Sequence, residues 1–199
     1  MISFTLFSTL ATFYFTMFFT PGPNNAMLTA SGMKFGFIRT LPHLTGITLG
    51  HILQISLTCF GLANLFLLYP QVQFYMKILC FLYLLYLGWK MIGSFSLIQK
   101  ESGRPLKFYE ASAFQFINPK AWSIAVTVAS GFFPSEENIF IGVIFVSITA
   151  AIINFPVCSL WALFGSGLRK FVNDEKVKKL VEYLLAILLV LTGLFILLK

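Results

Sequence analysis

Apolar segments long enough to cross a lipid bilayer occupy most of the 199-residue chain. A helix needs about 20 apolar residues to span the hydrocarbon core, and the sequence contains six such segments. They cover roughly residues 3–31, 43–68, 73–93, 112–133, 139–165 and 180–198. Because lipid offers the backbone no hydrogen-bonding partners, such segments are expected to be helical. The sequence therefore predicts an all-α integral membrane protein with six transmembrane helices.

The composition argues against a water-soluble protein. Hydrophobic residues make up 58% of the chain and charged residues 11%, whereas a soluble domain carries roughly a quarter of its residues as charged ones. The net charge of +7 would suggest nucleic-acid binding in a soluble protein, but here the basic residues lie in short connectors between apolar segments. We therefore expect the lipid bilayer as a partner and no nucleic acid. The first segment has no preceding Lys or Arg, so we expect a retained span rather than a signal peptide.

The basic residues alternate strictly between connectors, and this predicts an orientation. The second connector, YPQVQ, has no basic residue, and the fourth, PSEEN, is acidic. Basic residues of the first, third and fifth connectors are Lys34, Arg39, Lys100, Arg104, Lys107, Arg169, Lys170, Lys176, Lys178 and Lys179. Since cytoplasmic loops carry an excess of Lys and Arg, we expect these three connectors inside and both termini outside.

The third connector, SFSLIQKESGRPLKFYE, is the only long polar stretch and divides one transmembrane domain, 1–199, into two halves. Repeat one covers about 1–95, a cytoplasmic linker about 96–110, and repeat two about 111–199. Because each half has an odd number of spans, the second half must enter the membrane in the opposite sense. The predicted architecture is therefore two inverted three-helix repeats.

The first segment of each half contains a proline break, TPGPNN at 20–25 and INPKAW at 117–122. Proline cannot donate a backbone hydrogen bond and clashes with the preceding turn, which frees carbonyls that lipid cannot satisfy. We expect helices 1 and 4 to be broken near the membrane midplane, facing protein or a watery cavity. A packing kink is the alternative explanation of each break.

The two breaks also predict a binding site. Pro23 and Pro119 suit the first turn of a new half-helix, where Asn can cap free amides. Each helix N-terminus carries about half a positive charge, and the buried Lys120 adds a full one, so the expected ligand is an anionic group such as a carboxylate. The candidate substrate-binding residues at the breaks are Thr20, Pro21, Gly22, Pro23, Asn24, Asn25, Asn118, Pro119 and Lys120.

Three further polar residues inside apolar segments are candidates for the same site: His51, Lys77 and Asn154. Intramembrane polar and ionisable groups are costly and often functional. His51 follows GITLG, whose glycines allow close helix approach, and it is either a ligand or proton carrier or a buried neutral imidazole. Lys77 can instead snorkel to the headgroups, and Asn154 can bond a neighbouring helix.

Other chemistries have little support in the sequence. The cysteines Cys59, Cys80 and Cys158 lie singly in apolar runs, without the spacing of a disulfide framework or zinc site. We find no nucleophile with a base, no paired carboxylates and no metal constellation at one depth. The chain is therefore not expected to be an enzyme or to need a metal or cofactor.

Several of these elements together resemble the lysine-exporter family of small amino-acid efflux proteins. They are TPGPNN, the turn MKFG, GITLG, FGLANL, KILCFLYLLYLGWK and FINPKAW, and the similarity covers nearly the full chain. The resemblance implies a bacterial inner-membrane exporter with about six spans, driven by an ion gradient. It places the family's motifs on residues 20–24 and 118–120, and a basic position on Lys77.

The chain departs from that family's pattern at His51, where many members are acidic, and at Cys80 and Cys158. A site with few acidic groups favours a neutral amino acid over a cationic one. The expected function is a secondary transporter exporting a small neutral amino acid or related metabolite. A homo-oligomer is compatible with this function. An accessory or structural membrane subunit, or a passive channel, remains the alternative.

Overall fold

The computed structural model describes residues 2–62, 68–92, 103–134, 138–171 and 175–198, and its elements there are all helical. This confirms the predicted all-α class. The elements are α1 (Phe4–Phe19), α2 (Pro23–Phe35), α3 (Phe37–Leu57), the π-helical turn η1 (Thr58–Leu62), α5 (Pro70–Met91), α6 (Phe108–Gln115), α7 (Pro119–Gly131), α8 (Ile139–Phe171) and α9 (Glu175–Leu198).

Two helical stretches in the described ranges are both long and apolar enough to cross a membrane, Phe37–Gly61 and Ile139–Leu168. Two shorter apolar stretches, Phe4–Phe19 and Ile78–Trp89, add to them. The helices follow the predicted apolar segments along the chain, but α3 begins at Phe37 instead of 43 and α8 runs on to Phe171 instead of 165. The number of spans remains a prediction.

Helical structure stops and restarts at both proline motifs. α1 ends at Phe19 and α2 begins at Pro23, with Gly22 fully extended (φ −179°, ψ 179°). α6 ends at Gln115 and α7 begins at Pro119, after Asn118 in an extended conformation. In α2 and α7 the proline occupies the first helical position, where its missing N–H costs no hydrogen bond.

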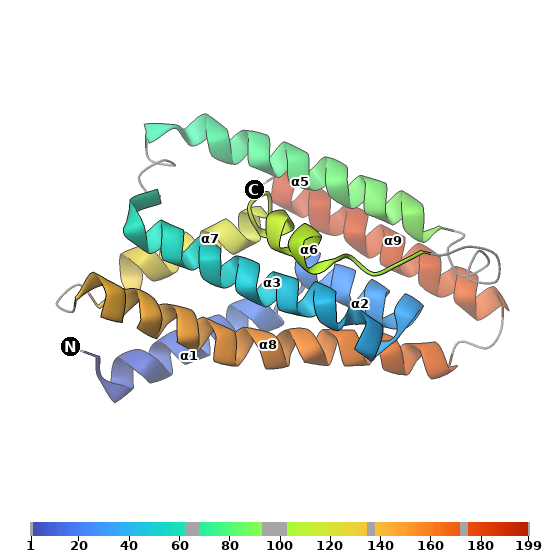
Figure 1. Ribbon diagram of the computed structural model, residues 1–199. Coiled ribbons are helices and arrows are strands. Elements are labelled where there is room, and N and C mark those ends of the chain that lie inside the picture. The colour runs from blue at the N-terminus through green and yellow to red at the C-terminus, as the bar shows by residue number, and fades with distance from the viewer. Residues whose placement is uncertain (1, 63–67, 93–102, 135–137, 172–174, 199) are drawn as a thin grey trace.

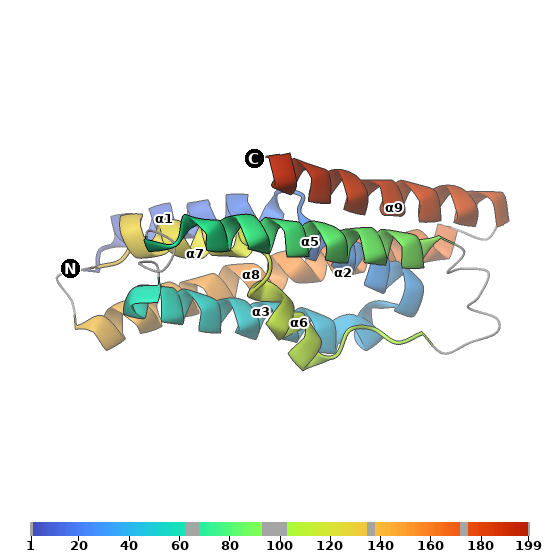
Figure 2. The same ribbon diagram turned by 90° about the horizontal axis from the view of Figure 1, so that it is seen from above.

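The helices form an elongated bundle whose helix ends cluster at its two ends (Figures 1 and 2). The N-terminus, the start of α5 and the start of α8 lie at one end, whereas the α2–α3 turn and the C-terminal ends of α5 and α8 lie at the other. The C-terminus lies nearer the middle of the long axis. The ends of α2, α5 and α8, which lead into the first, third and fifth connectors, are thus at the same end of the molecule, whereas α6 lies near the middle.

Glycines allow two close helix crossings. A β-carbon on Gly32 would collide with the backbone oxygen of Ala162, and one on Gly165 with that of Thr29, so α2 and α8 touch backbone to backbone. On α3, a β-carbon on Gly50 would lie 2.6 Å from the Cα of Ser112 in α6, and Gly46 is similarly close to Phe108. The close approach predicted from GITLG is therefore confirmed.

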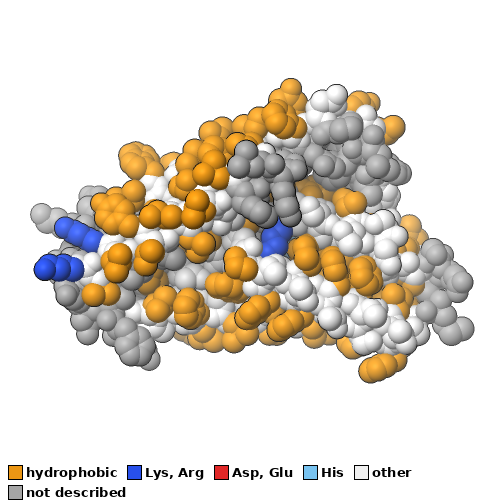
Figure 3. All heavy atoms as spheres, turned by 180° about the vertical axis from the view of Figure 1, so that it is seen from behind, with side chains coloured by type: hydrophobic (Ala, Val, Ile, Leu, Met, Phe, Trp, Pro, Cys, Tyr) orange, Lys and Arg blue, Asp and Glu red, His pale blue; other side chains and the backbone are white. Residues whose placement is uncertain are grey.

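The surface is rich in large apolar side chains, which suits contact with lipid. Figure 3 shows them over most of one face, with Lys and Arg side chains at one end and at one place near the middle. Exposed residues on α8 illustrate the pattern: Ile144, Ile148 and Ile152 each expose more than half of their surface. Exposed apolar surface on this scale indicates a partner other than water.

Candidate functional site

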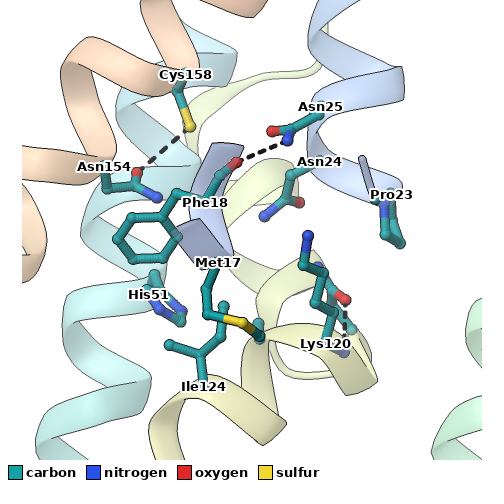
Figure 4. Close-up of a pocket in the computed structure, with 13 residues that line it drawn as sticks. Met17, Phe18, Pro23, Asn24, Asn25, His51, Lys120, Ile124, Asn154 and Cys158 are labelled. Atoms are coloured by element: carbon teal, nitrogen blue, oxygen red, sulfur yellow. Dashed lines mark hydrogen bonds between the residues drawn. The ribbon is translucent and has the colours of Figure 1, made fainter. Parts of the chain in front are cut away.

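A cavity lies where the ends of α1, α2 and α7 meet α3 and α8, and its empty space is about 370 Å³ including the mouth. Figure 4 shows the residues that surround it. Asn24 and Lys120 lie on one side in this view, and His51 and Asn154 on the other. The polar side chains that line it are Asn24, Asn25, His51, Asn118, Lys120 and Asn154.

The Lys120 ammonium binds the C-terminal end of α1. Its Nζ donates to the carbonyl oxygens of Thr20 (2.7 Å) and Pro21 (3.2 Å) and to the hydroxyl of Thr20 (2.9 Å). A helix C-terminus carries partial negative charge, so the cation is stabilised there. Gly22 makes room for it, since a β-carbon at that position would lie 2.9 Å from Lys120 Cδ. Lys120 therefore joins α7 to α1 across the cavity.

Asn25 closes the same helix end from the other side. Its amide nitrogen donates to the carbonyl oxygens of Phe18 (2.7 Å) and Thr20 (2.9 Å). These carbonyls have no intrahelical partner because α1 stops at Phe19. At the second break, the Asn118 side chain caps α7 by accepting from the backbone N–H of Lys120 at 3.1 Å. Side-chain amides thus satisfy backbone groups at both breaks.

A paired amide contact connects the two breaks directly. Asn24 Nδ2 donates to Gln115 Oε1 at 2.8 Å, and Gln115 Nε2 donates back to Asn24 Oδ1 at 3.2 Å. The Gln115 amide also donates to the Ala111 carbonyl, within α6. The start of α2 and the end of α6 are therefore held together, although 91 residues separate them.

His51 and Asn154 stand on the opposite wall, and both are buried. His51 Nδ1 lies 3.2 Å from Gln54 Oε1, while Gln54 Nε2 donates to the Gln115 carbonyl at 2.9 Å. Asn154 Oδ1 accepts from the Thr48 hydroxyl at 2.8 Å and weakly from the Cys158 thiol. Asn154 therefore links α8 to α3, as the helix-bonding interpretation anticipated, and also lines the cavity.

The structure brings together most of the candidates from the sequence. Thr20 and Pro21 contribute backbone oxygens to Lys120, and Pro119 forms the first position of α7. The remaining candidates from the two breaks, with His51 and Asn154, line the cavity. Lys77 lies in α5, and its side chain falls outside the described residues.

Three residues that hydrogen-bond to the cavity lining escaped the sequence analysis: Gln54, Gln115 and Thr48. Each has a polar side chain within an apolar segment, and each is almost fully buried. The two glutamines stand three residues from a candidate, Gln54 after His51 and Gln115 before Asn118. Gln54 and Thr48 each lie three residues from His51 in α3, so that spacing places them on the same helix face, and this signal could have found them. Gln115 is the last residue of α6 and Asn118 lies beyond that helix, so no helix-face signal pointed to Gln115.

The described lining of the cavity carries the ammonium of Lys120 and several asparagine amides but no carboxylate, so the cavity is cationic. An ion pair at the end of the third connector lies outside the cavity lining: Arg104 donates two hydrogen bonds of 2.7 Å to Glu110. With a further bond from the Lys107 backbone N–H, this lowers the pKa of the Glu110 carboxyl to about 2. Within the described ranges no three His, Cys, Asp or Glu residues cluster as metal ligands would, and all three cysteines are free.

Comparison with models of protein families shows which family this chain belongs to. The model of the LysE type translocator family matches residues 15–199. The chain belongs to the LysE type translocator family. The match spans both proline breaks and every helix from α2 onward, and it confirms the resemblance seen in the sequence.

Relatives in the LysE type translocator family include transport proteins of enteric bacteria. The cysteine/O-acetylserine efflux protein of Salmonella paratyphi A is 31% identical over 147 residues, which cover 73% of this chain and 75% of the relative. The protein of the same name from Escherichia coli K12 is 29% identical over 162 residues, covering 81% and 83%. No solved structure matches this chain.

Proposed function

We propose that this protein is a secondary transporter that exports a small neutral amino acid, of the size of cysteine or O-acetylserine, across the bacterial cytoplasmic membrane. The observation that carries the proposal is the cavity at which both interrupted helices meet, with the Lys120 ammonium bridging from α7 to the end of α1. Relatives named as efflux proteins support the class and the direction of transport.

In this proposal, α1 with α2 and α6 with α7 are the broken first helices of two inverted repeats. The second repeat continues through α8 and α9, as the first continues through α3 and α5. Two observations support this: both interruptions precede a proline at the first helical position, and both line one cavity. Broken helices at such a place are the usual binding elements of inverted-repeat transporters.

The substrate carboxylate would bind at the N-termini of α2 and α7, and it would draw Lys120 away from α1. The ammonium now pairs with neutral carbonyls of Thr20 and Pro21, and charge-assisted bonds to a carboxylate are stronger than these. Binding would thus release the contact between α7 and α1. Because this contact joins the two halves, its release gives a physical route from substrate binding to movement of one repeat against the other.

A neutral amino acid fits the charge of the cavity better than a cationic one. Lys120 already places one positive charge there, and the described lining offers no carboxylate to balance a second. A buried, unpaired charge is costly. Lysine or arginine as the transported solute is therefore disfavoured.

Reconstitution of the purified chain in liposomes tests the proposal. Vesicles loaded with labelled cysteine, serine or O-acetylserine should release label faster than empty-membrane controls, and an imposed ion gradient should change the rate. Absence of flux for all three solutes would contradict the transporter assignment. Flux that follows the solute gradient alone, insensitive to any ion gradient, would favour a passive channel.

A further inference from the structure

One acceptor atom in the cavity has no partner. The buried side-chain nitrogens without a hydrogen bond in the described ranges are both ring nitrogens of His43, Nε2 of His51 and Nε1 of Trp161. Among these residues, His51 lines the cavity, and its side chain is 97% buried, with 3% exposed. An unpaired polar atom in so enclosed a place calls for an explanation, since leaving it without a partner costs free energy.

The surrounding network sets the tautomer of His51. Gln54 Nε2 donates to the Gln115 carbonyl, so the Gln54 oxygen must face His51. A carbonyl oxygen only accepts, and therefore His51 Nδ1 carries the hydrogen. In the neutral ring, Nε2 is then a bare lone pair. Phe18 packs edge-on against the imidazole at 5.2 Å and restrains its orientation.

Several other acceptors around the cavity already have donors. The carbonyls of Phe18 and Thr20 accept from Asn25, and those of Thr20 and Pro21 accept from Lys120. Asn154 Oδ1 accepts from Thr48 and Cys158. Within the described lining, His51 Nε2 is the fully buried side-chain acceptor that has no hydrogen-bond partner.

We propose that His51 Nε2 accepts a hydrogen bond from the α-ammonium group of the transported amino acid. This inference rests on the proposed function. An amino acid brings three ammonium N–H groups into a cavity without a described carboxylate, and each needs an acceptor when desolvated. Figure 4 shows His51 across the cavity from Lys120, so the ammonium and carboxylate of one molecule would be drawn to opposite walls.

Gln54 acts in this proposal as a positioning residue rather than as a ligand. Its amide nitrogen donates to the Gln115 carbonyl, so its oxygen faces the imidazole and accepts the hydrogen of Nδ1. This leaves Nε2 without a hydrogen. The specificity for a free α-amino group thus depends on a chain of two side chains and one backbone oxygen from α3 and α6.

Competition against labelled L-cysteine flux in proteoliposomes tests the inference. The competitors are L-cysteine, 3-mercaptopropionate, which lacks the ammonium, and L-2-aminobutyrate, which carries a methyl group in place of the thiol. Wild type should prefer L-cysteine to 3-mercaptopropionate. In His51→Leu this preference should shrink by about tenfold, as expected for one lost hydrogen bond to a charged group, while His51→Asn, which keeps an acceptor oxygen, should retain part of it.

His43→Leu is the matched control, because His43 is also buried on α3 but does not line the cavity. It should leave the preference unchanged. If L-cysteine and 3-mercaptopropionate lose inhibitory strength equally in His51→Leu, His51 has a structural role and the inference is overturned. Loss of the preference for cysteine over 2-aminobutyrate would instead place the thiol at His51, which also overturns it.

Nitrogen NMR of the histidine-labelled wild-type protein gives a second measurement that needs no variant to fold. The His51 Nε2 signal should be that of an unprotonated ring nitrogen and should shift on addition of L-cysteine but not of 3-mercaptopropionate. A protonated Nε2 in the free protein, or the same shift with both compounds, would contradict the proposal. Failure of wild type to bind any amino acid would instead overturn the proposed function itself.

Discussion

Lys120 shows how a half-buried charged side chain can be accommodated among apolar helices. An unpaired ammonium at membrane depth costs about 2.5 kcal/mol or more, and here three oxygens at the end of α1 solvate it. The same contacts leave the ammonium next to the cavity. The residue therefore links α7 to α1 and is also placed beside the cavity where an anionic ligand could reach it.

Replacing Lys120 with Met should reduce amino-acid flux by at least about tenfold, because a charge-assisted bond contributes about 1.5–3 kcal/mol. Flux should be measured in proteoliposomes at equal protein content. Lys179→Met, at an exposed position on α9, is the control and should transport normally. Normal flux in Lys120→Met would remove Lys120 from the mechanism.

The Asn24–Gln115 pair should behave as a unit. Asn24→Leu leaves the fully buried Gln115 amide without this partner, and Gln115→Leu does the same to the half-buried Asn24 amide. Each should lower the free energy of unfolding, by about 1–3 kcal/mol for Asn24→Leu. The double variant should lose less than the sum of the two. Thermal unfolding of the purified variants in detergent measures this cycle, and strictly additive losses would show that the amides do not depend on each other.

The crossing of α2 and α8 depends on two glycines that face each other's helix. Gly32 lies against Ala162 and Gly165 against Thr29, and neither position has room for a β-carbon. Since α2 begins at the first break, this contact also fixes the direction of its N-terminus toward the cavity. Two helices are thus positioned by the absence of side chains.

Gly165→Ala should therefore destabilise the protein by about 1–3 kcal/mol, the usual cost of overpacking. Gly167 offers a matched control in the same helix, because a β-carbon there meets nothing within 4 Å. Gly167→Ala should be neutral or stabilising by up to about 1 kcal/mol through helix propensity. Equal melting temperatures of the two variants would show that the crossing tolerates a side chain.

The arrangement of helix ends bears on how the whole molecule sits in a membrane. The ends of α2, α5 and α8 that lead into the basic connectors lie together at one end of the bundle (Figure 1). Cytoplasmic loops are the ones rich in Lys and Arg. The end with the α2–α3 turn is therefore the one we expect to face the cytoplasm.

Reporter fusions test this orientation. Alkaline phosphatase fused after Pro134, in the fourth connector, should be active because it is exported, whereas a fusion after Gly103, in the third, should be inactive. Fluorescent-protein fusions at the same sites should give the opposite pattern. Activity at Gly103 without activity at Pro134 would reverse the predicted orientation.

Much of the fold could be predicted from local sequence properties. Apolar length predicts helices because a backbone in lipid must satisfy its own hydrogen bonds, and the prolines at 23 and 119 mark helix starts through their fixed geometry. The glycines of GITLG likewise indicated the close crossing of α3. These signals act over a few residues and need no knowledge of the rest of the chain.

Only the tertiary structure showed how the candidate residues meet. The sequence singled out Lys120 and Asn24 for a ligand, but not that Lys120 would bind the end of α1 or that Asn24 would pair with Gln115, 91 residues away. Nor did it show that Gln54 would orient His51. Whether a segment forms a helix depends on neighbouring residues. Hydrogen-bond partners between helices depend on which helices pack together and at what rotation, and the packing depends on the whole chain.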